Sequence, residues 1–431
     1  MGWGLKRNQR TCREQGKTRV ARRETRLRRT HAEDTRPLVT RAATPTATDL
    51  DTDAAVERWL ASVRKSAILA LDTEGASFHR FIDRVYLVQL STRDQHAIID
   101  PLPITAPALL GEMVEDPKVE IVFHDADYDL RLLRQDYGWQ VRNVFDTRIA
   151  AQLLGLKAFG LAALLERSFG LKLDKKHQRA DWSMRPLTAD MLDYAAQDTM
   201  HLLGLRDILH GELQAKGRLA WAQEEFLRLE QIGWAADDPS NAFLKVKGAR
   251  DLTRRELAIF KELVIWRDAT ALKLDRATFR VVSNEVLFDA VRALPATKDA
   301  LGKLKGMPRG ILERAADEIL AAIARGQAVA EADLPRFPKS ARWDRDPEFD
   351  HKVGALKSVR DEAAMRLELD PGVLCSRDRM EQVARLLPGE VAALEAIPEF
   401  RKWQIAELGA GFVKALGPWR KKDSPYREEE G

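Results

Sequence analysis

Cysteine is nearly absent from this chain of 431 residues, which contains only Cys12 and Cys375. Two cysteines so far apart exclude a disulfide framework and a zinc site of the usual kind. The chain also lacks any apolar run approaching the roughly 18 residues that a membrane-spanning helix needs. Residues 1–30 are too basic and too poor in apolar side chains for a secretory signal. We therefore expect a cytoplasmic protein with no membrane association.

Acidic side chains are scarce only at the N-terminus, where residues 1–30 contain 11 Lys and Arg against Glu14 and Glu24. The net charge of +4 therefore comes from this segment, because the rest of the chain is slightly acidic. Such a composition is typical of a disordered tail. The tail is open to several interpretations: a solvated segment, a non-specific nucleic-acid binder, an organelle transit peptide, or an artefact of a start codon assigned too far upstream.

Two kinds of hydrophobic pattern divide the chain. Short apolar runs at residues 66–71, 86–91, 96–100 and 119–123 predict strands. Helices are predicted between and after them, at residues 107–115, 126–137, 146–154, 161–169 and 188–213. This mixture predicts an α/β domain with a central sheet. Beyond residue 235 the strand patterns disappear and the chain becomes helical. The predicted boundaries are a tail and linker at 1–52, the α/β domain at 53–215, a connector at 216–247, a helical domain at 248–328, a linker at 329–347, a second helical domain at 348–420, and a tail at 421–431.

The two helical blocks share a sequence pattern. Matching positions recur about 93 to 95 residues apart, namely Arg267-Asp268 with Arg360-Asp361, Leu272-Lys273-Leu274-Asp275 with Leu367-Glu368-Leu369-Asp370, and Leu294-Pro295 with Leu387-Pro388. A fixed period of this kind indicates duplication of a small helical module. Two unrelated helical bundles are the alternative.

Carboxylates are spaced along the α/β domain in a way that favours a metal site. Asp72 and Glu74 lie two residues apart at the end of a predicted strand, so their side chains leave the same face. Asp129 follows another strand and begins a helix, although Asp125 and Asp127 compete with it for the same role. Converging carboxylates repel one another unless cations lie between them, and hard divalent cations prefer oxygen ligands.

The last pair of candidates is Tyr194 and Asp198, which lie on one face of a predicted helix because they are four residues apart. Asp198 completes a carboxylate cage. Tyr194 is a poor general base at neutral pH, because the pKa of its phenol is ordinarily about 10. We expect it to orient the attacking water or the scissile phosphate. A carboxylate cage with two divalent ions is the usual apparatus for cutting phosphodiester bonds, so the sequence predicts a metal-dependent nuclease.

These three segments resemble the Exo I, Exo II and Exo III motifs of the DEDD 3′-to-5′ exonucleases. A Tyr four residues before the last Asp is typical of the DEDDy branch, and the chain resembles ribonuclease D within it, where a His precedes the Exo II Asp by five residues, as His124 precedes Asp129. The first helical block resembles an HRDC domain, and the second resembles a more divergent HRDC-like domain. Gly75-Ala76-Ser77 departs from the family pattern, in which bulkier residues often follow the Glu.

The resemblance implies a ribonuclease H-like α/β exonuclease core followed by two all-α HRDC-like domains. It implies two Mg²⁺ or Mn²⁺ ions held by Asp72, Glu74, Asp129 and Asp198, with Tyr194 orienting water. It also implies release of 5′-nucleoside monophosphates from RNA with a free 3′ end, such as tRNA precursors and other small structured RNAs. No obligate protein partner is inferred.

Basic and aromatic residues near the motifs are candidates for contacting nucleic acid. The candidates are His124, Lys175, Trp182, Arg185, Lys303, Lys305 and Arg309. The alternative, that these residues form structural ion pairs and packing contacts, stays open. Two other functions also stay open: a 3′-to-5′ DNA exonuclease of the same superfamily, and a non-catalytic RNA-binding scaffold, which the intact set of five motif residues disfavours.

Overall fold

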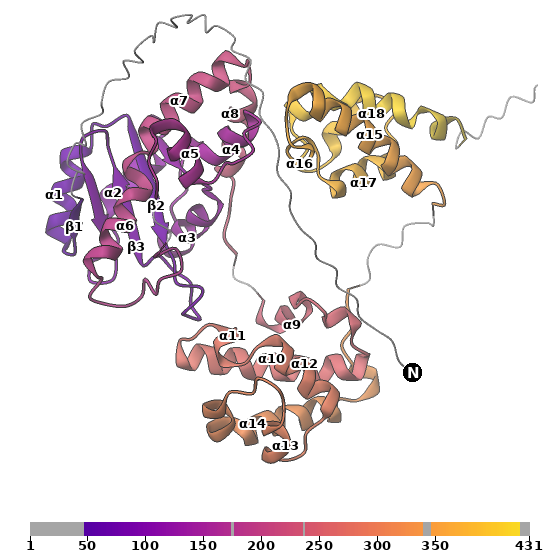
Figure 1. Cartoon of the computed structure of the whole chain (residues 1–431). Coiled ribbons are helices and arrows are strands. Elements are labelled where there is room, and N and C mark those ends of the chain that lie inside the picture. Colours follow the sequence, from indigo (N-terminus) through magenta and orange to yellow (C-terminus); the bar gives the residue numbers. More distant parts are fainter. Residues whose placement is uncertain (1–46, 174–175, 236–237, 339–345, 423–431) are drawn as a thin grey trace, which may run out of the picture. The chain divides into compact units, whose positions relative to one another are not determined.

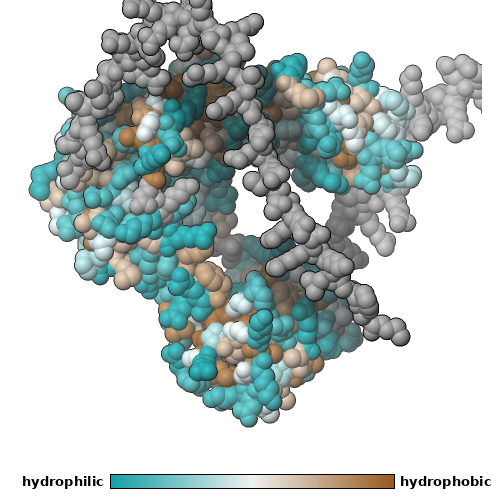
Figure 2. Space-filling model, viewed as in Figure 1, coloured by the Kyte–Doolittle hydropathy of each residue, from teal (hydrophilic) through white to brown (hydrophobic). Residues whose placement is uncertain are grey.

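A computed structural model describes residues 47–173, 176–235, 238–338 and 346–422. The basic segment at residues 1–30 and Lys175 lie outside these ranges. The described chain comprises an α/β domain and two helical modules (Figure 1). Hydrophilic residues cover much of the face drawn in Figure 2, with hydrophobic residues scattered among them. Within the described ranges no helix is long and apolar enough to cross a membrane.

A mixed six-stranded sheet forms the centre of the α/β domain, with strand order β1-β4-β3-β2-β5-β6. Strand β2 pairs antiparallel with β3 and parallel with β5, so it lies in the middle of the sheet. The strands span Thr48–Leu50 (β1), Ile68–Glu74 (β2), Leu87–Ser91 (β3), His96–Ile99 (β4), Glu120–Phe123 (β5) and Val144–Asp146 (β6). The four predicted strands are confirmed.

Two strands were not predicted, and both are short. Strand β1 lies in the segment that we expected to be a linker, and it pairs in parallel with β4. Strand β6 pairs with β5 immediately before a helix that we had expected to begin at Asp146. Three residues are too few to establish an alternating pattern, so these strands depend on pairing with distant neighbours.

Helices cover both faces of the sheet. Alternate residues such as Leu69 and Leu71 pack in one core with helices α1 (Asp53–Val63), α2 (Ala108–Glu115) and α3 (Asp127–Tyr137). On the opposite face, Leu87 and Ile98 pack against α6 (Ala189–Met200). The remaining helices of the domain are α4 (Thr147–Leu153), α5 (Leu161–Phe169), α7 (Leu202–Ala215) and α8 (Leu219–Leu229). One long helix was predicted at residues 188–213; the structure instead divides it at His201.

The two helical modules have matching elements. The first contains α10 (Arg254–Leu274), α11 (Thr278–Val281), α12 (Asn284–Ala293), α13 (Lys298–Gly302) and α14 (Arg309–Ala328). The second contains α15 (Phe349–Leu367), α16 (Pro371–Leu374), α17 (Arg377–Leu386), a 3₁₀ helix (Val391–Ala396) and α18 (Lys402–Lys422). From α11 to α14, each element begins 93 residues before its counterpart.

Turn geometry repeats with the same period. The first long helix of each module ends at a residue with a positive φ angle, 42° at Asp275 and 55° at Glu368. The third helix of each module, α12 or α17, ends at a leucine in the left-handed conformation, with φ of 47° at Leu294 and 48° at Leu387. Left-handed leucine is uncommon, so its recurrence at equivalent positions supports the predicted duplication over two unrelated bundles.

Candidate metal and nuclease site

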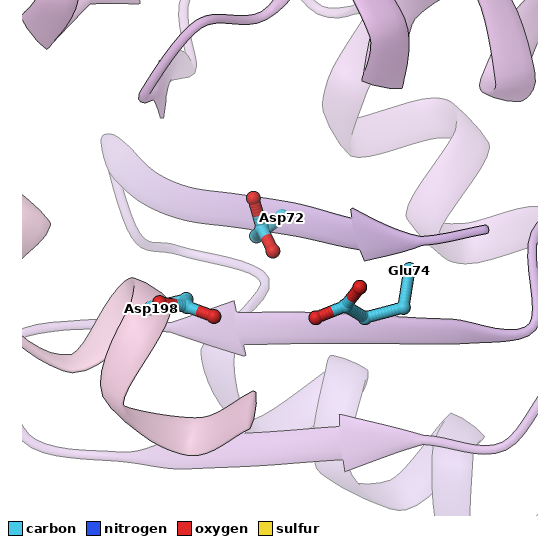
Figure 3. A group of neighbouring side chains, drawn as sticks. All are labelled: Asp72, Glu74 and Asp198. Atoms are coloured by element: carbon cyan, nitrogen blue, oxygen red, sulfur yellow. The ribbon is translucent and has the colours of Figure 1, made fainter. Parts of the chain in front are cut away.

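Three carboxylates from two elements meet at the carboxyl end of β2. Asp72 and Glu74 leave the same face of this strand, and Asp198 reaches them from α6 (Figure 3). One oxygen from each of the three groups can be chosen so that all three atoms lie within 4.8 Å of one another. This separation suits oxygen ligands of a shared divalent cation.

Hydrogen bonds cap helix α6 and connect it to the sheet beside these carboxylates. The Thr188 side chain caps the helix by accepting a bond from the backbone N–H of Met191. Further along, the hydroxyls of Thr199 and Ser91 lie 2.8 Å apart, and Ser91 also bonds His96 at 2.8 Å. Because Asp198 directly precedes Thr199, this contact fixes the height of Asp198 above the strands.

Asp129 lies next to the cluster but is held differently. It lies in the first turn of α3 and is almost completely buried. Its Oδ1 accepts hydrogen bonds from the backbone N–H of Thr73, at 2.9 Å, and from the Thr73 hydroxyl, at 2.6 Å. Thr73 lies between Asp72 and Glu74, so the strand that supplies two carboxylates also orients a third. The sequence analysis missed Thr73, although a hydroxyl residue between two acids was a visible signal.

The two acidic residues that competed with Asp129 have other partners. Asp125 forms an ion pair with Arg148, and Asp127 pairs with Arg131 at 2.8 Å. Asp125 also has a φ of 70°, a conformation that costs energy for any residue with a side chain. The burial of Asp129 against Thr73 therefore favours it over its neighbours as the fourth acidic group of the site.

Mutual repulsion is strong in this cluster. Burial, followed by the charge of Asp198, raises the pKa of Asp72 well above its ordinary value. Burial and the neighbouring carboxylates likewise raise the pKa of Glu74 and of Asp129, and burial together with Asp129 raises the pKa of Asp198 to about 7. Within the described residues, four carboxyl groups with raised pKa values and no cationic side chain among them form the donor set that a hard divalent cation stabilises. The residues therefore fit a metal centre.

A cleft of about 390 Å³ opens over the carboxylates. Asp72, Tyr194 and Asp198 line one part of it, and His124, Arg148 and the first turn of α5 line another. Tyr194 lies one turn before Asp198 on α6, as its spacing predicted, and its ring lies 6.2 Å from that of Trp182 and 5.9 Å from that of His177. A phenol and two carboxylates of the cluster thus share one solvent-accessible space with a histidine.

The hydrogen bonds of His124 identify its tautomer. The Thr147 hydroxyl donates its single proton to the carbonyl of Phe123, at 3.0 Å, while His124 Nδ1 lies 2.9 Å from the same hydroxyl oxygen. Nδ1 must therefore carry the proton, which leaves a lone pair on Nε2. Burial, and then the charge of Arg148, lowers the pKa of His124 to about 4, so the imidazole is neutral at neutral pH.

Two other candidates for nucleic-acid contact have internal partners. The Trp182 side chain is buried among Tyr86, Leu87 and Ala195. Arg185 forms an ion pair with Asp100 and donates a 2.8 Å hydrogen bond to the carbonyl of Tyr86. These contacts favour the structural alternative for both residues.

The helical module presents its three candidates at the surface. Lys303, Lys305 and Arg309 are exposed around the turn before α14, where Gly306 has a φ of 85°. Among the described residues, none of the three forms an ion pair. Their charges are therefore accessible to a polyanion.

Comparison with known proteins identifies each part. Residues 48–214 match a family model described as 3′-5′ exonuclease, and residues 256–323 and 353–416 match the HRDC domain. The chain is 31% identical to ribonuclease D of Granulibacter bethesdensis over 77% of this chain and 85% of the relative. It is 32% identical to ribonuclease D of a Shewanella species over 85% and 89% of the two chains.

The solved structures include a similar enzyme. The crystal structure of Escherichia coli RNase D, described as an exoribonuclease involved in structured RNA processing, has 27% sequence identity and a TM-score of 0.68, covering 88% of this chain and all of that one. The matches to the exonuclease and HRDC family models extend over the part of the chain that these relatives cover. This chain is a 3′-to-5′ exoribonuclease and belongs to the ribonuclease D family.

Proposed function

We propose that Asp72, Glu74, Asp129 and Asp198 hold two divalent ions, Mg²⁺ or Mn²⁺, and that the enzyme releases 5′-nucleoside monophosphates one at a time from an RNA 3′ end. The observation that carries this proposal is the convergence of acidic groups whose pKa values are all raised by burial and by one another. When bound, such ions lower the pKa of an attacking water and neutralise charge on the leaving oxygen.

The side chains of the chain have separable tasks in this scheme. The four carboxylates would hold the cations, and the cations would supply positive charge next to the scissile phosphate. Tyr194, on the wall of the same cleft, orients the attacking water by hydrogen bonding through its hydroxyl. Thr73 keeps the Asp129 carboxylate in a fixed rotamer through two short hydrogen bonds. Positioning the reactants in this way converts binding energy into rate.

The substrate class that we propose is RNA with a free 3′ end, including tRNA precursors and other small structured RNAs. His124 contributes to the choice of RNA. Its neutral imidazole lines the cleft with Nδ1 occupied by Thr147, so Nε2 is an acceptor. A ribose hydroxyl of the terminal nucleotide is a donor of matching chemistry, and the 2′-hydroxyl is what distinguishes RNA from DNA.

Substitution of His124 tests this role. We expect His124→Ala to reduce the preference for a 3′-terminal ribonucleotide over a terminal 2′-deoxynucleotide by about 2- to 10-fold, the worth of one neutral hydrogen bond. His124→Gln, whose amide oxygen can accept at the same depth, is the matched control and retains part of the preference. The ratio of kcat/KM on the two substrates is the measurement. An unchanged ratio in His124→Ala removes this residue from substrate selection.

The principal test measures release of mononucleotides from a 3′-extended tRNA, with Mg²⁺, with Mn²⁺ and with a chelator, beside a single-stranded DNA of equal length. Asp198→Ala is the matched variant. We expect metal-dependent trimming of the RNA by the wild-type chain and none by the variant, which still binds RNA. Equal attack on the DNA would assign the chain to DNA metabolism, and binding of RNA without cleavage by the wild-type chain would favour a scaffold.

A further inference from the structure

Gln89 is a buried amide beside the acidic cluster. It lies on β3 directly opposite Asp72 in the antiparallel pairing with β2, so the two side chains project from the same face of the sheet. Its side chain is completely buried, and neither Oε1 nor Nε2 has a hydrogen-bond partner among the described residues. A buried polar group without a partner is rare in native proteins and calls for an explanation.

Helix α6 covers Gln89. Two residues further along the same face, Ser91 bonds Thr199 of this helix, and in the other direction Leu87 packs with Ala195. The segment of α6 between these contacts contains Asp198. Gln89 is therefore enclosed between a strand that carries Asp72 and a helix that carries Asp198.

Within the part of the chain that the structure describes, neither of these carboxylates accepts a hydrogen bond. The raised pKa of Asp72 has burial and the charge of Asp198 as its causes, and no hydrogen bond contributes to it. No hydrogen bond contributes to the raised pKa of Asp198 either. An unpartnered amide and two unpartnered carboxylates thus lie between α6 and the face of the sheet that it covers. An amide Nε2 has two protons to donate, and a carboxylate has lone pairs to receive them.

Packing alone gives no reason for an amide at this position. Burying an unpaired amide destabilises the folded state, and an apolar side chain of the same shape avoids that cost. Ligand carboxylates in metal sites, by contrast, are commonly oriented by hydrogen bonds from residues behind them. The location of Gln89 fits this second use.

We propose that Gln89 is a positioning residue of the metal centre. Its Nε2, which has no partner among the described residues, donates to the carboxylates of Asp72 and Asp198 when they ligate a cation, and holds them in that orientation. This inference rests on the proposed metal centre. Gln89 itself touches neither the cation nor the RNA, so its effect is on metal affinity and through it on activity at limiting metal.

Gln89→Leu separates the two roles, because leucine fills a similar volume without an amide. We expect the dissociation constant for Mn²⁺, measured by electron paramagnetic resonance on the full chain, to rise by about 10- to 100-fold. The thermal midpoint of the metal-free variant should be equal to or above that of the wild type, since an unpaired buried group has been removed. Gln89→Met gives the same test if leucine disturbs folding.

A matched control lies on the same face of the sheet. Ile98 is opposite Gln89 on β4, away from Asp72, and Ile98→Val should leave the Mn²⁺ dissociation constant within about twofold of the wild type. If Gln89→Leu binds Mn²⁺ as tightly as the wild type, the positioning role is overturned while the metal centre stands. If the wild-type chain itself binds no Mn²⁺, the proposed metal centre fails as well.

Discussion

Replacing Thr73 with valine tests whether the hydroxyl of Thr73 supports metal binding by orienting Asp129. Thr73→Val keeps the β-branched shape that suits a strand and removes only the hydroxyl that lies 2.6 Å from Asp129 Oδ1. The backbone N–H of residue 73, at 2.9 Å, still reaches the same oxygen. The perturbation is therefore the loss of one of two hydrogen bonds to one buried carboxylate.

The magnitude follows from the charge of the acceptor. A hydrogen bond to a charged group contributes about 1.5–3 kcal/mol. Because the carboxylate must be ionised to hold a cation, this loss falls on the metal-bound state. At 1.4 kcal/mol for each factor of ten, metal affinity should weaken by about 10- to 100-fold. Thr73→Ser retains a hydroxyl and should remain close to the wild type.

The assay is exoribonuclease rate as a function of Mg²⁺ concentration on one RNA. We expect the half-saturating Mg²⁺ concentration of Thr73→Val to increase by about 10-fold or more, while kcat at saturating Mg²⁺ remains within a few-fold of the wild type. A variant with unchanged half-saturation and normal kcat would refute the reasoning. So would a loss of kcat that saturating metal does not restore, since it would place the hydroxyl in the chemical step.

Three further predictions concern other parts of the chain. Tyr194→Phe should lower kcat by about 100-fold in single-turnover assays without changing the Mn²⁺ dissociation constant; full activity would exclude the phenol from the mechanism. In the presence of a chelator, the free energy of unfolding should fall as pH rises from about 4 to about 7, because the folded acidic cluster retains protons that the unfolded chain releases near pH 4, and saturating Mg²⁺ should abolish this slope. Replacing Lys303, Lys305 and Arg309 together with alanine should weaken RNA binding and reduce the slope of log K against log salt by up to about 2, with kcat at saturating RNA unchanged; an unaltered slope would show that this turn does not bind the phosphate backbone.

The carboxylates of the site were predictable from the sequence because their geometry is local. A two-residue spacing on a strand places Asp72 and Glu74 on one face, and a four-residue spacing on a helix does the same for Tyr194 and Asp198. The convergence of the two pairs followed from the resemblance to known motifs. In the structure, oxygen atoms of Asp72, Glu74 and Asp198 lie close together, and Asp129 accepts hydrogen bonds from Thr73 between the first two.

Other features depend on contacts that no local pattern encodes. Trp182 and Arg185 are of residue types that often contact nucleic acid. In the structure, however, Trp182 is buried beside Tyr86, and Arg185 forms an ion pair with Asp100, and both partners are distant in the sequence. The proposed role of Gln89 could not be predicted for a different reason. It is a single polar residue in an apolar strand, and only the strand register shows that it lies opposite Asp72.

The 93-residue offset between the helical modules allows each residue of one module to be compared with its counterpart in the other. Lys303 and Lys305 have Ala396 and Pro398 as their counterparts, whereas Arg309 has Lys402. Two copies of one scaffold therefore offer a polyanion different numbers of charges at the same turn. Transplanting two lysines into the second copy would add charge at a known place without redesigning the backbone.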